Sequence, residues 1–108
     1  MTTREDVLKQ YEAALELAGL ERKGKSMPYT SANGHMFSQL NKAGELGIRL
    51  SKEDTAHFDV TYGAQPFMSY GAKMREYVLV PSELLNDQMA LSTFLKRGYN
   101  YVNSLPPK

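Results

Sequence analysis

Apolar residues recur at the spacing of a helix face in three stretches of the chain, and each stretch has suitable residues at its ends. Thr2 and Glu5 have the spacing of a capping box, and Gly19 suits the left-handed position that follows a helix. Ser51 and Asp87 are suited to cap the second and third helices. The sequence therefore predicts helices over 3–18, about 52–62 and about 88–104.

Shorter stretches between these helices alternate apolar and polar residues, as strands with one buried face do. Leu46, Ile48 and Leu50 form the apolar half of the clearest alternation, so we expect that strand to have one buried and one wet face. Gly44 suits the turn before it, and apolar residues on both faces near Val80 favour a central position for the last strand. The predicted hairpins join 35–40 to 45–50 and 67–70 to 73–80.

The segment 20–34 has no clear periodicity and is predicted to be irregular, with a short extended piece around 26–30 and a turn at Asn33 and Gly34. The predicted order is α-ββ-α-ββ-α. Because hairpins pair their strands antiparallel, this order defines a two-layer α+β fold with helices on an antiparallel sheet of four or five strands. Residues 1–108 are expected to form one such domain.

Composition narrows the class of protein. With 42% hydrophobic residues and a formal net charge of +1, the chain is typical of a globular protein, and its charge does not favour nucleic acid or an anionic membrane. The absence of cysteine excludes disulfides and thiolate chemistry. No signal peptide is visible, and no apolar stretch approaches the roughly 20 residues that span a bilayer. We therefore expect a soluble, cytoplasmic protein.

One short string matches a nucleotide-binding motif. Residues 19–26, GLERKGKS, fit the P-loop pattern G-x-x-x-x-G-K-[ST], in which Lys25 would reach the phosphates and Ser26 a magnesium ion. A P-loop, however, lies between a buried strand and a helix. Helical periodicity precedes this string, and Met27 and Pro28 follow it. We interpret the match as a helix end followed by a basic loop.

No set of side chains predicts catalysis or metal binding. His35 and His57 are the only histidines, lie on different predicted elements and have no further ligand at a recognised spacing. A catalytic triad is defined by geometry, and nothing in the sequence points to one. We therefore predict no catalytic residue, no metal and no cofactor, and we expect the chain not to be an enzyme.

Aromatic and basic residues beside the predicted sheet are the candidates for a binding surface. Exposed tyrosine and arginine are enriched in protein interfaces, although cross-strand packing explains tyrosines in a sheet equally well. The candidate residues are Lys25, Tyr29, His35, Arg49, Tyr70, Arg75 and Tyr77.

Several short stretches follow one another in a characteristic order: GHMF (34–37), LGIRL (46–50), YGAQPF (62–67), MREY (74–77) and VPSELL (80–85), then a final helix. In this order they resemble the TfoX N-terminal domain-like family, and KSMPYTS (25–31) is similar to small stand-alone bacterial members. The resemblance implies an α+β domain with an antiparallel sheet. The member after which the family is named regulates natural competence and has a second domain, which we do not expect in residues 1–108. The family has no agreed catalytic residues.

The sequence leaves three hypotheses for the function, of which it favours the first two. The first is a non-enzymatic regulatory or protein-interaction module, whose partner is another protein or a second copy of the chain. The alternative is a small-molecule binding domain with its site between the 25–35 loop and the sheet, which requires a concave pocket with a few converging polar groups. A nucleotide enzyme that uses Lys25 and Ser26 is a third hypothesis.

Overall fold

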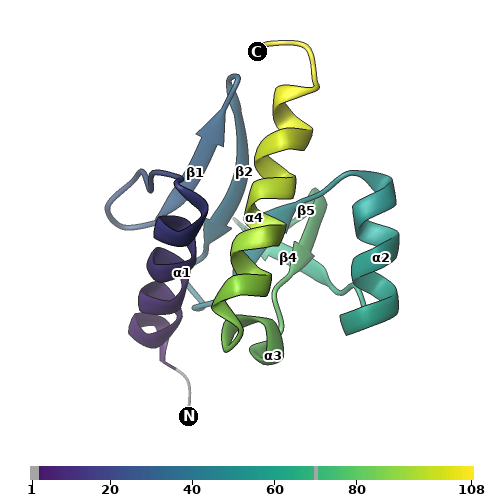
Figure 1. Ribbon diagram of the computed structural model, residues 1–108. Helices are drawn as coiled ribbons and strands as arrows, with labels where there is room; N and C mark the ends of the chain where they lie inside the picture. Colours follow the sequence, from purple (N-terminus) through teal and green to yellow (C-terminus); the bar gives the residue numbers. More distant parts are fainter. Residues whose placement is uncertain (1–2, 70) are drawn as a thin grey trace.

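Five antiparallel strands form one sheet, and helices pack against it (Figure 1). The computed structural model describes residues 3–69 and 71–108. The elements are α1 (Arg4–Ala18), β1 (Tyr29–Ala32), β2 (His35–Leu40), β3 (Leu46–Arg49), α2 (Lys52–Tyr62), β4 (Pro66–Ser69), β5 (Ala72–Leu79), α3 (Ser82–Leu85) and α4 (Gln88–Asn103). The strand order is β1-β2-β3-β5-β4. The predicted α+β fold is confirmed, and so is the central position of β5.

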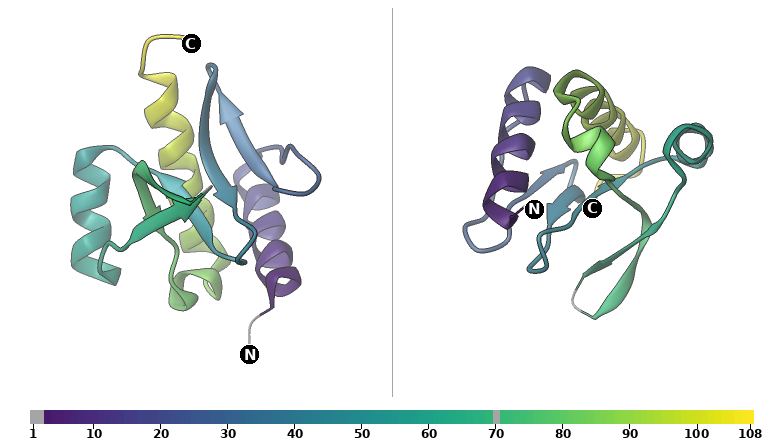
Figure 2. Two further views of the ribbon diagram at one scale, coloured as in Figure 1. Left: turned by 180° about the vertical axis from the view of Figure 1, so that it is seen from behind. Right: turned by 90° about the horizontal axis from the view of Figure 1, so that it is seen from below.

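The main core lies between the sheet and the pair α1 and α4, which run side by side on one face (Figures 1 and 2). Burial of their apolar stripes is the principal force that joins the two layers. α2 reaches the same core through Phe58, whose ring meets Phe94 of α4 edge-on with centroids 5.2 Å apart. The largest fully buried aliphatic residues of this core are Leu15, Leu40, Leu46, Ile48, Leu50, Leu84, Leu91 and Leu95.

The helix ends follow the predicted caps with one shift. The capping box of α1 joins Thr3 and Asp6, one residue after the predicted pair. Gly19 ends α1 with a φ of 70°, in the left-handed region. Ser51 and Asp87 cap α2 and α4 by accepting hydrogen bonds from backbone N–H groups of the first turn, as predicted.

The segment expected to be irregular contains an edge strand, β1. The turn that joins it to β2 is formed by Asn33 and Gly34, whose φ values are 55° and 80°, as a two-residue hairpin turn requires. The four residues of β1 are too few and too polar for a visible alternation. Instead, a tertiary contact holds the strand: the hydroxyls of Thr30 and Ser38 are hydrogen-bonded, and Ser38 lies 2.5 Å from the hydroxyl of Tyr11 on α1.

The face of β3 that turns away from α4 is also covered, which corrects the expectation of a wet face. Phe67 of β4 lies on Gly47, so closely that a Cβ at this glycine would lie 2.4 Å from ring atoms. Phe67 also stacks on Tyr77 of β5, with centroids 5.8 Å apart. A small aromatic cluster therefore anchors the β4–β5 hairpin to the sheet, while the rest of the hairpin extends away from the helices (Figure 2).

Candidate functional site

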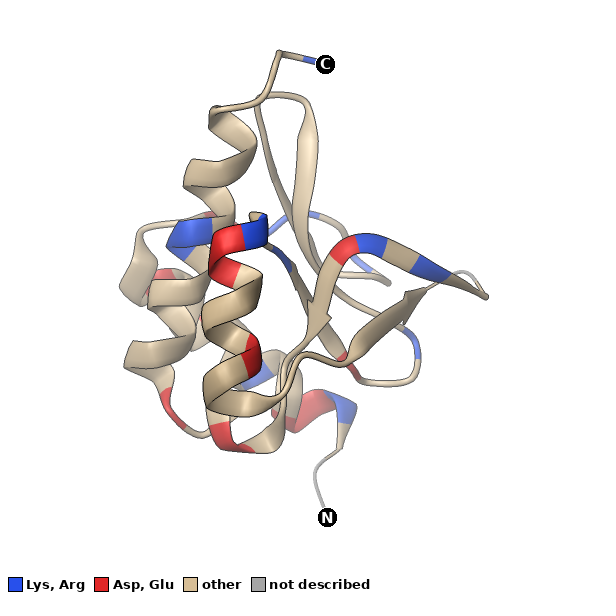
Figure 3. Ribbon diagram, turned by 90° about the vertical axis from the view of Figure 1, so that its right-hand side faces the viewer, with Lys and Arg blue, Asp and Glu red and all other residues tan. Residues whose placement is uncertain are grey.

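A hollow of about 590 Å³ lies between the start of α2 and the strands β3 and β5. The charged side chains at its edge come from both sides, and Figure 3 shows the charges along β5 beside the first turn of α2. Three of these side chains are cationic and one is anionic. The lining residues are Arg49, Leu50, Lys52, Thr55, Arg75 and Glu76.

Glu76 is the centre of the hydrogen bonds in this hollow. Its Oε1 accepts from Nε and Nη2 of Arg49, at 3.1 and 2.6 Å. Its Oε2 accepts from the hydroxyl of Tyr101 on α4. The guanidinium of Arg49 also lies 5.6 Å from the centre of the Tyr101 ring, in cation–π geometry. One carboxylate thus links β3, β5 and α4.

The backbone of Glu76 is strained. Its φ is 69°, and among the described residues only Asn33 shares a positive φ without being glycine. A side chain in this left-handed region costs roughly 1–2 kcal/mol. The conformation coincides with an irregular register between β4 and β5, and the carbonyl oxygen of Glu76 still accepts a hydrogen bond of 3.0 Å from Leu50 N–H. Strain of this kind often accompanies functional sites.

The electrostatics of the hollow leave positive charge in excess. Partial burial acts to raise the pKa of Glu76, but hydrogen bonds from Tyr101 and Arg49 and the positive charges of Arg49 and Arg75 outweigh it, so this pKa lies below its usual value. The hydrogen bond to Glu76 raises the pKa of Tyr101. Among the described residues, Lys52 and Arg75 form no ion pair.

The structure brings some predicted surface residues together and separates others. Arg49 and Arg75 both line the hollow. Tyr77 is buried and donates a 2.8 Å hydrogen bond to the carbonyl of Met36, and burial raises its pKa, so it is a packing residue and not part of an exposed surface. Tyr70 lies outside the described residues.

The other three predicted residues lie near β1, at the opposite edge of the sheet. Lys25 is exposed in the loop before β1. Tyr29 begins β1, and a Cβ at Gly24 would lie 3.0 Å from its ring. His35 donates from Nε2 to the carbonyl oxygen of Pro106, at 2.9 Å. These residues therefore do not join Arg49 and Arg75 in one surface.

Two charged residues of the hollow, and the tyrosine that is hydrogen-bonded to one of them, were missed from the sequence. Lys52 and Glu76 are single charges in ordinary surroundings, and Tyr101 falls on the apolar stripe of its helix, which predicts core packing. Only the left-handed backbone of Glu76 and its position opposite Arg49 mark it, and neither is visible in a sequence.

The P-loop-like string has a different structural context from a P-loop. Gly19 ends helix α1, and Lys23 and Tyr29 exchange backbone hydrogen bonds of 2.7 and 2.9 Å, so that strand β1 follows the string. A helix before and a strand after is the reverse of the order that a P-loop requires. Within residues 3–69 and 71–108, no group of three histidine, aspartate or glutamate side chains is placed to hold a metal.

Comparisons with protein families and with characterised proteins find no match to this chain. The resemblance to the TfoX N-terminal domain-like family therefore stays a prediction. In the part of the chain that the structure describes, no helix is both long and apolar enough to cross a bilayer.

Proposed function

We propose that this chain is a non-catalytic regulatory module that binds an acidic segment of a partner protein in the hollow between α2 and β5. The observation that carries the proposal is the positive charge of the lining, in which Arg49, Lys52 and Arg75 are accompanied by a single carboxylate, Glu76. Glu53 and Asp54 in the first turn of α2 already compensate its helix dipole, so the attraction for a negative charge comes from the three cationic side chains.

Glu76 occupies the place that a carboxylate of the partner would take. Arginine binds carboxylates through two nearly parallel N–H groups, and Arg49 already directs two of its N–H groups to Glu76. An incoming acidic side chain pairs with Lys52 and Arg75 or competes with Glu76 for Arg49. Charges at the rim of an interface mainly determine its specificity and association rate.

The resemblance to the TfoX N-terminal domain-like family supports the proposal independently of the charges. The similar stretches LGIRL and MREY contain Arg49 and Arg75. The α+β fold with its antiparallel sheet agrees with what that resemblance implies. A regulatory role in a bacterial cytoplasm, with a protein partner or a second copy of the chain, is part of this proposal.

A charge-matched binding experiment tests the proposal. The probe is a fluorescein-labelled oligoglutamate peptide, and its anisotropy reports binding. We expect the Lys52→Ala/Arg75→Ala variant to bind about tenfold more weakly, a difference of about 1.4 kcal/mol. The control is Lys9→Ala/Lys96→Ala, which removes the same charge from exposed positions on α1 and α4 and should change the affinity less than about twofold.

The Glu76→Gln variant is expected to change the peptide affinity in the opposite direction. Because it removes the competing carboxylate and keeps the size of the side chain, the peptide should bind several-fold more tightly. Equal losses in the two double variants would mean that the peptide responds only to overall charge and would contradict the proposal. Sedimentation of the parent protein measures its oligomeric state. Self-association would identify a second copy of the chain as the partner, and a monomer would point to a different protein.

A further inference from the structure

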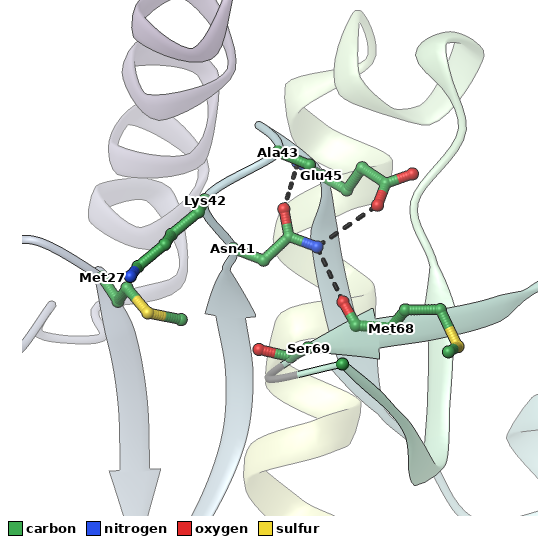
Figure 4. Close-up of a pocket in the computed structure, with 8 residues that line it drawn as sticks. Met27, Asn41, Lys42, Ala43, Glu45, Met68 and Ser69 are labelled. Carbon is green, nitrogen blue, oxygen red and sulfur yellow. Dashed lines mark hydrogen bonds between the residues drawn. The ribbon is translucent and has the colours of Figure 1, made fainter.

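A second pocket lies where the turn between β2 and β3 approaches the end of β4 (Figure 4). Its volume is about 340 Å³, at the lower end of the roughly 300–1,000 Å³ of ligand pockets. Met27 contributes one wall from the loop before β1. The other walls come from the turn and from β4, and not from the predicted residues Lys25, Tyr29 and His35.

The walls of this pocket are tied together by hydrogen bonds, so the backbone that frames it is preformed. The side chain of Asn41 accepts from Glu45 N–H at 2.9 Å and donates to the carbonyl oxygen of Met68 at 2.7 Å. Arg4 of α1 donates to the carbonyl oxygens of Asn41 and Ser26, at 3.1 and 2.6 Å. The turn, the end of β4 and the loop next to Met27 are therefore fixed relative to one another.

Ser69 carries a buried hydroxyl without a partner in this pocket. The residue is 5% exposed, and its Oγ has no hydrogen bond. An unpaired buried polar group costs roughly 1–3 kcal/mol, and most such groups in proteins are paired. Gln10 and Arg22 also have an unpaired buried atom, but each makes a hydrogen bond through another atom of its side chain. Figure 4 shows the hydroxyl of Ser69 directed toward the gap beside Met27 and Lys42.

The surrounding side chains define the ligand chemistry. Lys42 has an exposed side chain and forms no ion pair among the described residues. Met27 and Met68 supply flexible apolar surface, which adapts to a short chain and can move aside to expose the hydroxyl. Glu45 lies on the other side of Asn41 from Lys42 and disfavours a second negative charge on a ligand (Figure 4).

We propose that this pocket binds a small monocarboxylate with a short apolar chain. The carboxylate accepts a hydrogen bond from the Ser69 hydroxyl and pairs with the Lys42 ammonium, while the chain packs on Met27 and Met68. This site uses none of the residues of the hollow beside α2, so it does not depend on the function proposed above.

Three probes with one six-carbon chain and different head groups test the ligand class: hexanoate, hexan-1-ol and hexylamine. We expect saturable binding of hexanoate, seen as amide chemical-shift changes at Lys42, Ser69 and Gly71, with weaker binding of the alcohol and none of the amine. Equal binding of hexan-1-ol or hexylamine overturns the assignment of a carboxylate.

Variants test the two anchoring residues. Lys42→Gln should weaken hexanoate binding about tenfold, whereas Lys52→Gln, in the other hollow, should leave it unchanged. Ser69→Ala should weaken binding and yet leave the melting temperature of the free protein unchanged or higher, because it removes an unpaired buried hydroxyl. A lower melting temperature with unchanged hexanoate binding would show that Ser69 is structural, and would overturn the proposal.

Discussion

The two outer hairpins of the sheet differ in whether their buried hydroxyl groups have hydrogen-bond partners. The β1–β2 hairpin packs under α1 and α4, and its buried hydroxyls pair with Tyr11 and with each other. At its turn, Asn33 donates to the carbonyl oxygens of Val102 and Leu105, at 3.0 and 2.8 Å. The β4–β5 hairpin extends from the sheet and carries the unpaired hydroxyl of Ser69 and the strained backbone of Glu76.

The difference separates polar groups that the fold pairs internally from groups that it leaves unpaired or strained. A hairpin covered by helices has to satisfy its polar groups internally, because a buried group without a partner destabilises the whole core. A hairpin that lies largely outside the main core can retain an unpaired group and a strained residue, because its own pairing and the Phe67 contact hold it in place. Departures from local rules are expected where a protein binds something. Both proposed sites lie against β4 or β5, in agreement with this reasoning.

The largest expected effect tests that anchor. Gly47→Ala places a Cβ 2.4 Å from ring atoms of the fully buried Phe67, so the ring or the strand has to shift. We expect a loss of about 3 kcal/mol in the free energy of unfolding, measured by urea denaturation. A loss below about 0.5 kcal/mol would mean that Phe67 does not anchor the hairpin.

A second substitution provides the control. Phe67→Leu shortens the side chain that the new methyl group would strike, so Gly47→Ala/Phe67→Leu should be more stable than the sum of the two single losses predicts. If the two losses in the free energy of unfolding are strictly additive, Gly47→Ala destabilises the sheet through a contact other than the one with Phe67.

The second largest expected effect tests the hydrogen-bonded hydroxyls of Tyr11, Thr30 and Ser38. Burial raises the pKa of Tyr11 to about 12, despite its hydrogen bonds with Ser38 and Thr30. The unfolded chain releases this proton near pH 10, so the folded state loses stability as the pH rises from about 10 to about 12. The expected loss is on the order of 2 kcal/mol, read from urea denaturation at a series of pH values.

Tyr11→Phe is the matched variant for this prediction. At pH 7 it should be about 1 kcal/mol less stable than the parent, because Ser38 and Thr30 remain paired with each other. Its stability should fall less steeply above pH 10, and the remaining fall reports other groups such as Tyr77, whose pKa burial also raises. Parallel curves for parent and variant would show that Tyr11 ionises as easily in the folded protein as in the unfolded chain.

Much of the fold follows from the sequence because its signals are local. The helix bounds follow from apolar spacing and caps at Ser51 and Asp87, and the hairpins from turns such as the one at Gly44. Strand β1 was predicted only as a short extended piece around 26–30, since the hydroxyl contacts that hold it run through Ser38 of β2 to Tyr11 of α1 and are not visible in its own residues. The covered face of Gly47 likewise results from Phe67, 20 positions further along the chain.

The candidate sites were predicted only in part. Of the predicted residues, Arg49 and Arg75 line the hollow, whereas Tyr77 was chosen for its residue type and is buried. Ser69 and Glu76 were missed because an unpaired hydroxyl and a positive φ are properties of the folded chain alone. The chemistry of a site without a motif is set by such departures, which residue types do not reveal.

The smallest expected effect isolates the strain at Glu76. Glu76→Gly and Glu76→Ala both remove the contacts with Arg49 and Tyr101, but only glycine adopts a φ of 69° without steric conflict. We expect the glycine variant to be about 1 kcal/mol more stable than the alanine variant in urea denaturation. The neighbouring Arg75, where φ is not positive, provides the control. There we expect the alanine variant to be about 0.5–1 kcal/mol more stable than the glycine variant, because glycine weakens an ordinary strand position. If alanine is the more stable residue at both positions, the backbone of Glu76 is not strained in solution, and the contrast between the two hairpins would rest on Ser69 alone.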